Sequence, residues 1–130
     1  MRSVVICASK KYKNEVKEFC QELEKLGVIV FAPNIQQPIS EDAFIHSAHV
    51  TKTIFKGLTL EHFDWIRKAD ICFLYNKKGY IGRSVTLELG YATALGKPIF
   101  ALEENTGDPC SDILIDKVIK SPKELLKVLK

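Results

Sequence analysis

No stretch of this sequence approaches the roughly 18 consecutive apolar residues that a membrane-spanning helix needs. The sequence also opens without a basic segment followed by a long apolar run, so we expect no secretory leader. Neither sign of charge dominates, because 19 basic and 16 acidic residues leave a net charge of only +3. That excess is too small to indicate a surface for nucleic acid or for an anionic membrane. We therefore expect a cytosolic protein that binds neither.

None of the four cysteines lies in a Cys-x-x-Cys pair, which argues against a zinc or dithiol motif. Cys7 and Cys72 occur within apolar runs, so free thiols in the core of a protein from a reducing compartment fit best. His46 and His49 are three residues apart, but no third ligand is evident beside them. We expect no metal site and no cofactor.

The length of 130 residues suits a single domain covering residues 1–130, and no repeat or linker divides it. Short apolar runs predict strands at 3–8, 28–32, 70–75, 99–102 and 117–119. Apolar spacing and caps predict helices at 13–26, 59–68 and 84–95, and a last helix that begins at the capping box Ser121-Pro122-Lys123-Glu124. Residues 34–57 have no clean period and predict a long, partly helical excursion.

The alternation of strands and helices predicts an α/β domain of three layers, Rossmann-like or flavodoxin-like, with a parallel sheet of about five strands. Ligands of such sheets bind at the carboxyl ends of the strands, where the strand order reverses. Loops and helix starts at this edge are therefore the first places to look for a site.

Glu88 is the one charged residue on the predicted inward stripe of helix 84–95. The stripe is otherwise apolar and consists of Val85, Leu89, Ala92 and Leu95. An isolated buried charge is costly, so Glu88 must be paired, protonated or facing a pocket. From spacing alone, a functional carboxylate and a rim carboxylate in a salt bridge both remain open.

Two loops at the same edge carry groups that suit an anion. Gly79 and Gly82 precede a helix that Ser84 can cap, and the amides of its first turn could bind a phosphate. The pattern is neither a Walker loop nor a dinucleotide fingerprint, and an ordinary glycine loop before a helix is the simpler interpretation. Ser9 and Lys10 follow the first predicted strand, where a phosphate contact and plain surface exposure are equally compatible with the sequence.

His62 lies in helix 59–68, and Asp64 follows two residues later. His62 shares a stripe with apolar side chains, which favours a histidine packed at the rim of the core. These apolar residues are Leu58, Trp65, Ile66 and Ala69.

In the next helix, Gly90 beside Ala92 could permit a close approach of helix to sheet.

Three segments are shared with one enzyme family: Ala69-Asp70, the block Leu87-Glu88-Leu89-Gly90-Tyr91-Ala92 after the glycine loop, and Gly96-Lys97-Pro98-Ile99. Together they resemble the nucleoside 2-deoxyribosyltransferase family, which includes 2'-deoxynucleoside 5'-monophosphate N-glycosidases. The resemblance covers most of the chain and is strongest over residues 58–102. It implies a nucleoside or nucleotide substrate, chemistry at the N-glycosidic bond and a homodimer or larger homo-oligomer.

The resemblance assigns the nucleophile to Glu88, whose carboxylate would attack the anomeric carbon and form a glycosyl-enzyme. Where the family often has an Asp that assists the leaving base, this sequence has His62, with Asp64 two residues on. A histidine can also donate that proton. Where the transferases carry another Asp, this sequence has Gly82.

The loop after the first strand, with Ser9 and Lys10, keeps a hydroxyl and a positive charge but lacks the glycines of the phosphate-specific hydrolases. We predict Glu88, His62 and Asp64 as catalytic, and Ser9, Lys10, Gly82 and Ser84 as substrate-binding. The competing hypotheses are a non-catalytic nucleotide-binding or sensing module, and an interaction domain that only keeps the fold.

Overall fold

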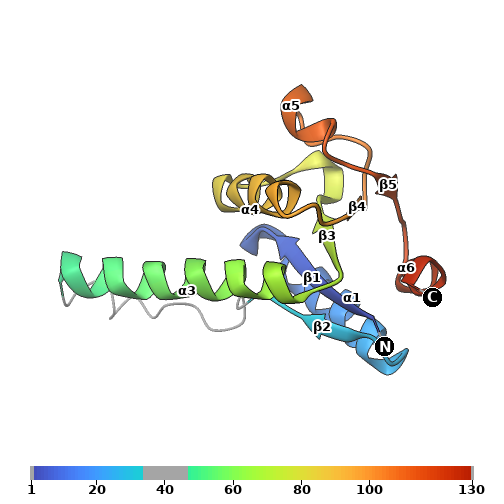
Figure 1. The fold of residues 1–130 in the computed structure, drawn as a ribbon, viewed down its shortest axis with the longest axis horizontal. Coiled ribbons are helices and arrows are strands. Elements are labelled where there is room, and N and C mark those ends of the chain that lie inside the picture. Colours follow the sequence, from blue (N-terminus) through green and yellow to red (C-terminus); the bar gives the residue numbers. More distant parts are fainter. Residues whose placement is uncertain (1, 34–46, 130) are drawn as a thin grey trace.

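The structure, a computed structural model, describes residues 2–33 and 47–129. In this part of the chain five parallel strands form one sheet in the order β2-β1-β3-β4-β5. They are β1 (Ser3–Ala8), β2 (Ile29–Phe31), β3 (Ile71–Tyr75), β4 (Ile99–Ala101) and β5 (Lys117–Val118). The expected α/β fold class is confirmed. The strand order reverses at β1, which lies between β2 and β3 (Figure 1).

Helices cover both faces of this sheet. They are α1 (Lys13–Lys25), α3 (Ala48–Lys68), α4 (Arg83–Ala94), α5 (Pro109–Asp112) and α6 (Pro122–Leu129), with single 3₁₀ turns η1 (Lys10–Tyr12) and η2 (Lys77–Gly79). Alternate side chains of β1 divide between two cores. Val4 and Ile6 pack with buried residues of α1 and α6, whereas Val5 and Cys7 pack with those of α3 and α4.

Helix α3 is much longer than the sequence predicts. We expected a start at a Thr59 cap, and this is wrong, because the helix begins at Ala48 with Ser47 as its cap. The Ser47 hydroxyl accepts a hydrogen bond from the Val50 backbone N–H at 3.1 Å. Its buried residues, His62 and Ile66, lie in the second half, and Figure 1 shows the first half extending beyond the sheet. A segment that faces no core has no amphipathic period to read.

Glycines end two of the helices as the sequence predicts. Gly27 after α1 and Gly96 after α4 have φ angles of +85° and +70°. The Gly96 N–H donates to Thr93 O, and the Lys97 N–H donates to Ala92 O, which satisfies two terminal carbonyls of α4. The start of α4 differs from expectation, because Gly82 occupies the cap position and Ser84 is the second residue of the helix. Ser84 therefore cannot cap it.

Two further elements complete the comparison with the sequence. The last helix starts as predicted, since the Ser121 hydroxyl accepts from the Glu124 N–H at 3.2 Å. Helix α5 is not among the helices that the sequence predicts, and it is held by the Asp108 carboxylate, which accepts from the Cys110 N–H at 3.2 Å. The prediction for 34–46, His46 included, lies outside the described residues. No helix in the described ranges has the length and apolar character needed to cross a membrane.

Candidate active site

Glu88 lies where α4 meets α3 at the carboxyl edge of the sheet. Its neighbours Val85, Leu89 and Ala92 are buried on the same face of α4, so the helix is anchored on both sides of the glutamate. Leu95, predicted on this stripe, is instead 41% exposed at the end of the helix. The Glu88 side chain is only 14% exposed. The inward stripe of α4 thus includes one carboxylate, at the rim of the core.

The carboxylate of Glu88 faces the ring of His62. Glu88 Oε2 lies 3.3 Å from His62 Nε2, at ion-pair distance. The contact does not meet hydrogen-bond geometry, and Oε2 is buried without a hydrogen-bond partner in the described part of the chain. A buried carboxylate oxygen without a hydrogen bond lowers the stability of the folded protein. It is the type of group that a bound molecule would satisfy.

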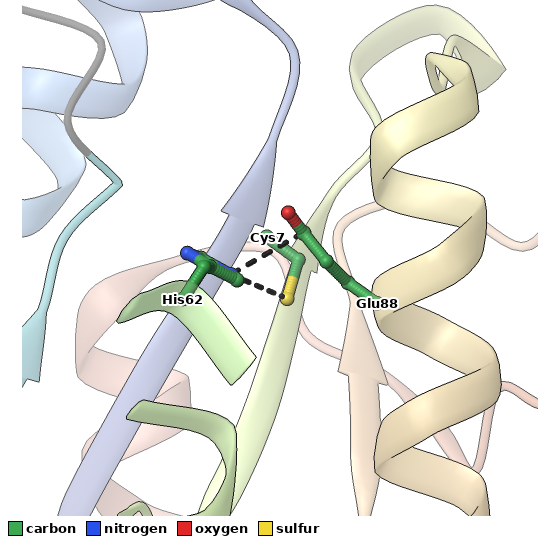
Figure 2. A group of neighbouring side chains, drawn as sticks. All are labelled: Cys7, His62 and Glu88. Carbon is green, nitrogen blue, oxygen red and sulfur yellow. Dashed lines mark hydrogen bonds and ion pairs between the residues drawn. The ribbon is translucent and has the colours of Figure 1, made fainter. Parts of the chain in front are cut away.

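Cys7 completes a compact group of three side chains (Figure 2). Its Sγ lies 3.6 Å from the same His62 Nε2, and the residue is fully buried. Three elements supply the group, since Cys7 is on β1, His62 on α3 and Glu88 on α4. A hydrogen bond with the Cys72 side chain, burial and the nearby Glu88 charge together raise the pKa of the Cys7 thiol well above its usual range.

A pocket of ≈ 390 Å³ opens beside Glu88 and His62. Residues of β1, η1, α3 and α4 and of the segments that connect them form its wall; the lining includes Ala8, Ser9, Lys10, Pro33, Leu58, Glu61, Trp65, Gly82, Arg83, Ser84 and Leu87. This volume falls within the range of roughly 300–1,000 Å³ that is usual for small-molecule sites. The structure therefore brings together six of the seven predicted site residues: Glu88, His62, Ser9, Lys10, Gly82 and Ser84.

The polar end of this pocket consists of two chain segments. Ser9 caps η1 by accepting a hydrogen bond from the Lys11 backbone N–H at 3.2 Å, which fixes its hydroxyl at the end of β1. Gly82, Arg83 and Ser84 form the N-terminus of α4, whose first amides have no partner within the helix. The N-terminus of α4 therefore brings a partial positive charge to this side of the pocket, and Ser9 and Ser84 bring one hydroxyl each.

The family model described as nucleoside 2-deoxyribosyltransferase matches residues 6–118 of the chain. The chain belongs to the nucleoside 2-deoxyribosyltransferase family. This family consists of glycosyl-transferring enzymes. The resemblance that the Glu88 block carries in the sequence is thereby confirmed.

Two solved structures share the fold of this nucleoside 2-deoxyribosyltransferase family member. One is the 2-deoxyribosyltransferase of the psychrotolerant bacterium Bacillus psychrosaccharolyticus, with 24% identity, a TM-score of 0.62, and coverage of 95% of this chain and 89% of that one. The other is a conserved protein from Enterococcus faecalis V583, with 16% identity, a TM-score of 0.59 and coverage of 98% and 96%. No curated protein matches the chain.

Asp64 is the predicted site residue that the structure keeps out of the pocket of this family member. Its carboxylate pairs with Lys68 Nζ at 2.7 Å and with Arg67 at 3.0 Å on the outer side of α3. These contacts, the one with Lys68 foremost, lower the pKa of Asp64. Residues two apart on a helix face different directions, so Asp64 lies away from the face of α3 that carries His62. Asp64 is a surface ion-pair residue.

Sequence reasoning missed Cys7 and Arg83 as neighbours of the site. The apolar run 3–8 identified a strand but not which side of the sheet each residue faces, so Cys7 was interpreted only as a core thiol. The predicted helix begins at Ser84, whereas Arg83 is the first residue of α4. An alternation of polar and apolar residues along these strands could have oriented Cys7, but apart from Ser3 the residues of β1 and β3 are apolar.

Proposed function

We propose that this family member cleaves the N-glycosidic bond of a nucleoside or nucleoside 5'-monophosphate, with Glu88 as the nucleophile. The observation that carries the proposal is the Glu88 side chain, which lines a pocket of ≈ 390 Å³ and whose buried Oε2 has no hydrogen-bond partner in the described part of the chain. A carboxylate in this position can face the anomeric carbon, where positive charge develops in the transition state.

In the first step a bond forms between a Glu88 carboxylate oxygen and the anomeric carbon, and the bond from that carbon to the base nitrogen breaks. The departing base keeps the electron pair and takes up a proton. His62 is the proposed donor, because protonated imidazole carries a proton on Nε2, which lies beside the Glu88 carboxylate. In the second step a water molecule or a second base attacks the anomeric carbon, the bond from that carbon to Glu88 breaks, and the attacking group loses its proton to the now neutral His62.

A 5'-phosphate on the substrate suits the polar end of the pocket. Ser9, Lys10, Arg83 and the N-terminus of α4 line that end, and all three side chains can donate to phosphate oxygens. With the phosphate there and the base toward Trp65, the sugar would lie beside Glu88. We therefore propose a nucleoside 5'-monophosphate as substrate and water as the acceptor, in a protein that acts as a homodimer in the cytosol.

The deciding experiment incubates the purified full chain with a panel of ribo- and deoxynucleosides and their 5'-monophosphates, with and without a second base. Chromatography then measures the base released and any exchanged nucleoside. We expect release from at least one monophosphate, and Glu88→Gln should lower it by about 10³-fold or more. The matched control Glu22→Gln, on the exposed side of α1, should keep wild-type activity.

The other outcomes of this experiment have definite meanings. Exchange that exceeds hydrolysis when a second base is present would assign transfer rather than hydrolysis. Saturable nucleotide binding without turnover, unchanged in Glu88→Gln, would replace the enzyme by a binding or sensing module. A chain that neither turns over nor is stabilised thermally by any nucleotide would support the interaction-domain hypothesis.

A further inference from the structure

The group formed by Cys7, His62 and Glu88 has the composition of a transition-metal site. One thiol sulfur, one imidazole nitrogen and one carboxylate oxygen lie within 4.8 Å of one another, which is the one such cluster in the described part of the chain. Three separate elements present them, so no two ligands depend on the same flexible loop. Sequence spacing could not reveal this set, because its members are brought together only by the fold.

The two distances from His62 Nε2 agree with those between ligands of a tetrahedral ion, and the donor atoms of Cys7 and Glu88 lie within 4.8 Å of each other. Zinc binds nitrogen and oxygen at roughly 2.0–2.2 Å and thiolate sulfur at about 2.3 Å, which places tetrahedral ligands roughly 3.3–3.6 Å apart. His62 Nε2 lies 3.3 Å from Glu88 Oε2 and 3.6 Å from Cys7 Sγ. Each of these two pairs, both of which include His62, can therefore share one ion.

The unsatisfied Glu88 oxygen is a second and independent indication. Oε2 is buried and has no hydrogen-bond partner in the described residues, while His62 Nε2 faces it outside hydrogen-bond geometry. A cation between the two atoms would satisfy both lone pairs at once. The pocket that borders Glu88 and His62 would leave the fourth position for a water molecule, as in open zinc sites.

We propose that Cys7, His62 and Glu88 bind a divalent transition-metal ion of the Zn²⁺ and Co²⁺ class. The thiolate and imidazole select such ions over Mg²⁺ and Ca²⁺, which prefer oxygen ligands. On binding, a metal–sulfur bond forms at Cys7 and its thiol proton passes to solvent. The thiolate and the Glu88 carboxylate together balance the charge of the ion. Because the ion occupies Glu88 and His62, the bound protein cannot use either for the proposed glycosidic chemistry.

The test is a titration of the reduced, metal-free full chain with Co²⁺. Tetrahedral Co²⁺ with a thiolate ligand absorbs in the visible and shows a sulfur-to-metal charge-transfer band in the near ultraviolet. We expect both features to saturate at one Co²⁺ per chain, to disappear on addition of Zn²⁺ and to persist in excess Mg²⁺. No absorbance change up to millimolar Co²⁺, with no heat of Zn²⁺ binding by calorimetry, would overturn the proposal.

Variants locate the site. Cys7→Ser should abolish the charge-transfer band, and Glu88→Gln should weaken Co²⁺ binding by about tenfold or more. The matched control Cys110→Ser removes an exposed thiol on α5 and should leave the titration unchanged. A band that survives in Cys7→Ser, or is lost in Cys110→Ser, would place the metal elsewhere. Should Cys7→Ser fail to fold, unaltered Co²⁺ affinity of Glu88→Gln alone would refute the site.

Metal binding is measured without substrate, so its outcome is separate from that of the proposed function. A chain that binds Co²⁺ but releases no base would keep the metal site and lose the glycosidase proposal. A chain that releases base but binds no metal would do the reverse. If both hold, stoichiometric Zn²⁺ should inhibit base release, and a chelator should restore it.

Discussion

His62 Nε2 and Glu88 Oε2 lie 3.3 Å apart across the packing of α3 against α4, and both side chains are more than four-fifths buried. Helical spacing left open whether Glu88 is a functional carboxylate or a rim carboxylate in a salt bridge. The carboxylate is both paired at the rim of the core and adjacent to a pocket, so the salt bridge does not exclude a functional role. Any change to one partner alters the environment of the other.

Replacing His62 tests its proposed role as the proton donor to the leaving base. We expect His62→Gln to lower kcat by about 10²–10³-fold for ordinary monophosphates, because loss of a general acid costs that much. For an N7-methylated guanine nucleotide the loss should be small, because that base carries a positive charge and departs as a neutral molecule without protonation. Steady-state kinetics on both substrates measure the difference.

The control for this histidine is His49→Gln, on the exposed first half of α3, which should match wild type on both substrates. An equal loss on both substrates in His62→Gln would contradict acid catalysis. It would instead mean that His62 only holds the Glu88 carboxylate in position.

Preference for a 5'-phosphate should depend on the segment after β1. We expect Lys10→Ala to raise KM for a 5'-monophosphate by about tenfold or more, as the loss of a charged hydrogen bond does, and to leave KM for the free nucleoside unchanged. Ser9→Ala should act in the same direction. The wild-type preference should also fall as salt concentration rises.

Kinetic constants for both substrate forms provide the measurement. Lys17→Ala, an exposed residue of α1, serves as the control because it removes the same charge away from the pocket. If Lys10→Ala weakened binding of nucleoside and monophosphate equally, Lys10 would not be a phosphate ligand.

The sequence predicted the central part of the fold well because its signals are local. The run 3–8 is continuously apolar and forms β1, and the helix over 13–26 ends at Gly27 as expected. Capping also located the start of α6 at Ser121. Each of these features depends on residues within a few positions of one another.

The contacts that assemble the site could not be predicted in this way. Glu88 was placed correctly on its helix, but its partner His62 is identified only once α3 and α4 are known to pack on the same face of the sheet. The same is true of Cys7, whose side of the sheet depends on strand order. Asp64 is the reverse case, since its proximity to His62 along the chain does not bring it to the pocket.

Gly90 gives a direct test of backbone preference in α4. We expected it to allow close packing against the sheet, and this is wrong, because it is exposed and an added Cβ would meet no atom within 4 Å. Glycine inside a helix costs roughly 0.5–1 kcal/mol relative to alanine. Gly90→Ala should therefore raise the free energy of unfolding by about that amount in urea titrations.

The matched control for this substitution is Gly27→Ala. Gly27 also has open space around it, but its φ of +85° strains any residue with a Cβ, so this variant should lose about 1 kcal/mol. A loss of stability in Gly90→Ala would mean that another surface covers α4. A homodimer would then be the first explanation to examine, by sedimentation of both variants.

Cys20 on α1 should make stability depend on alkaline pH. Burial, with a smaller contribution from Glu24, raises the pKa of its thiol from 9.0 to about 12 in the folded protein. As the pH rises above 9, the unfolded chain releases this proton while the folded chain retains it, so unfolding becomes more favourable. One pH unit above the unfolded pKa is worth about 1.4 kcal/mol.

Between pH 8 and pH 10, wild type should therefore lose about 1 kcal/mol more than Cys20→Ala, which has no thiol to titrate there. Urea denaturation at the two pH values measures this difference, and all other titrating groups cancel in it. Cys110→Ala, which removes an exposed thiol, should lose as much stability as wild type. If Cys20→Ala lost as much as wild type, the Cys20 thiol would ionise alike in both states, and its burial in α1 would not hold in solution.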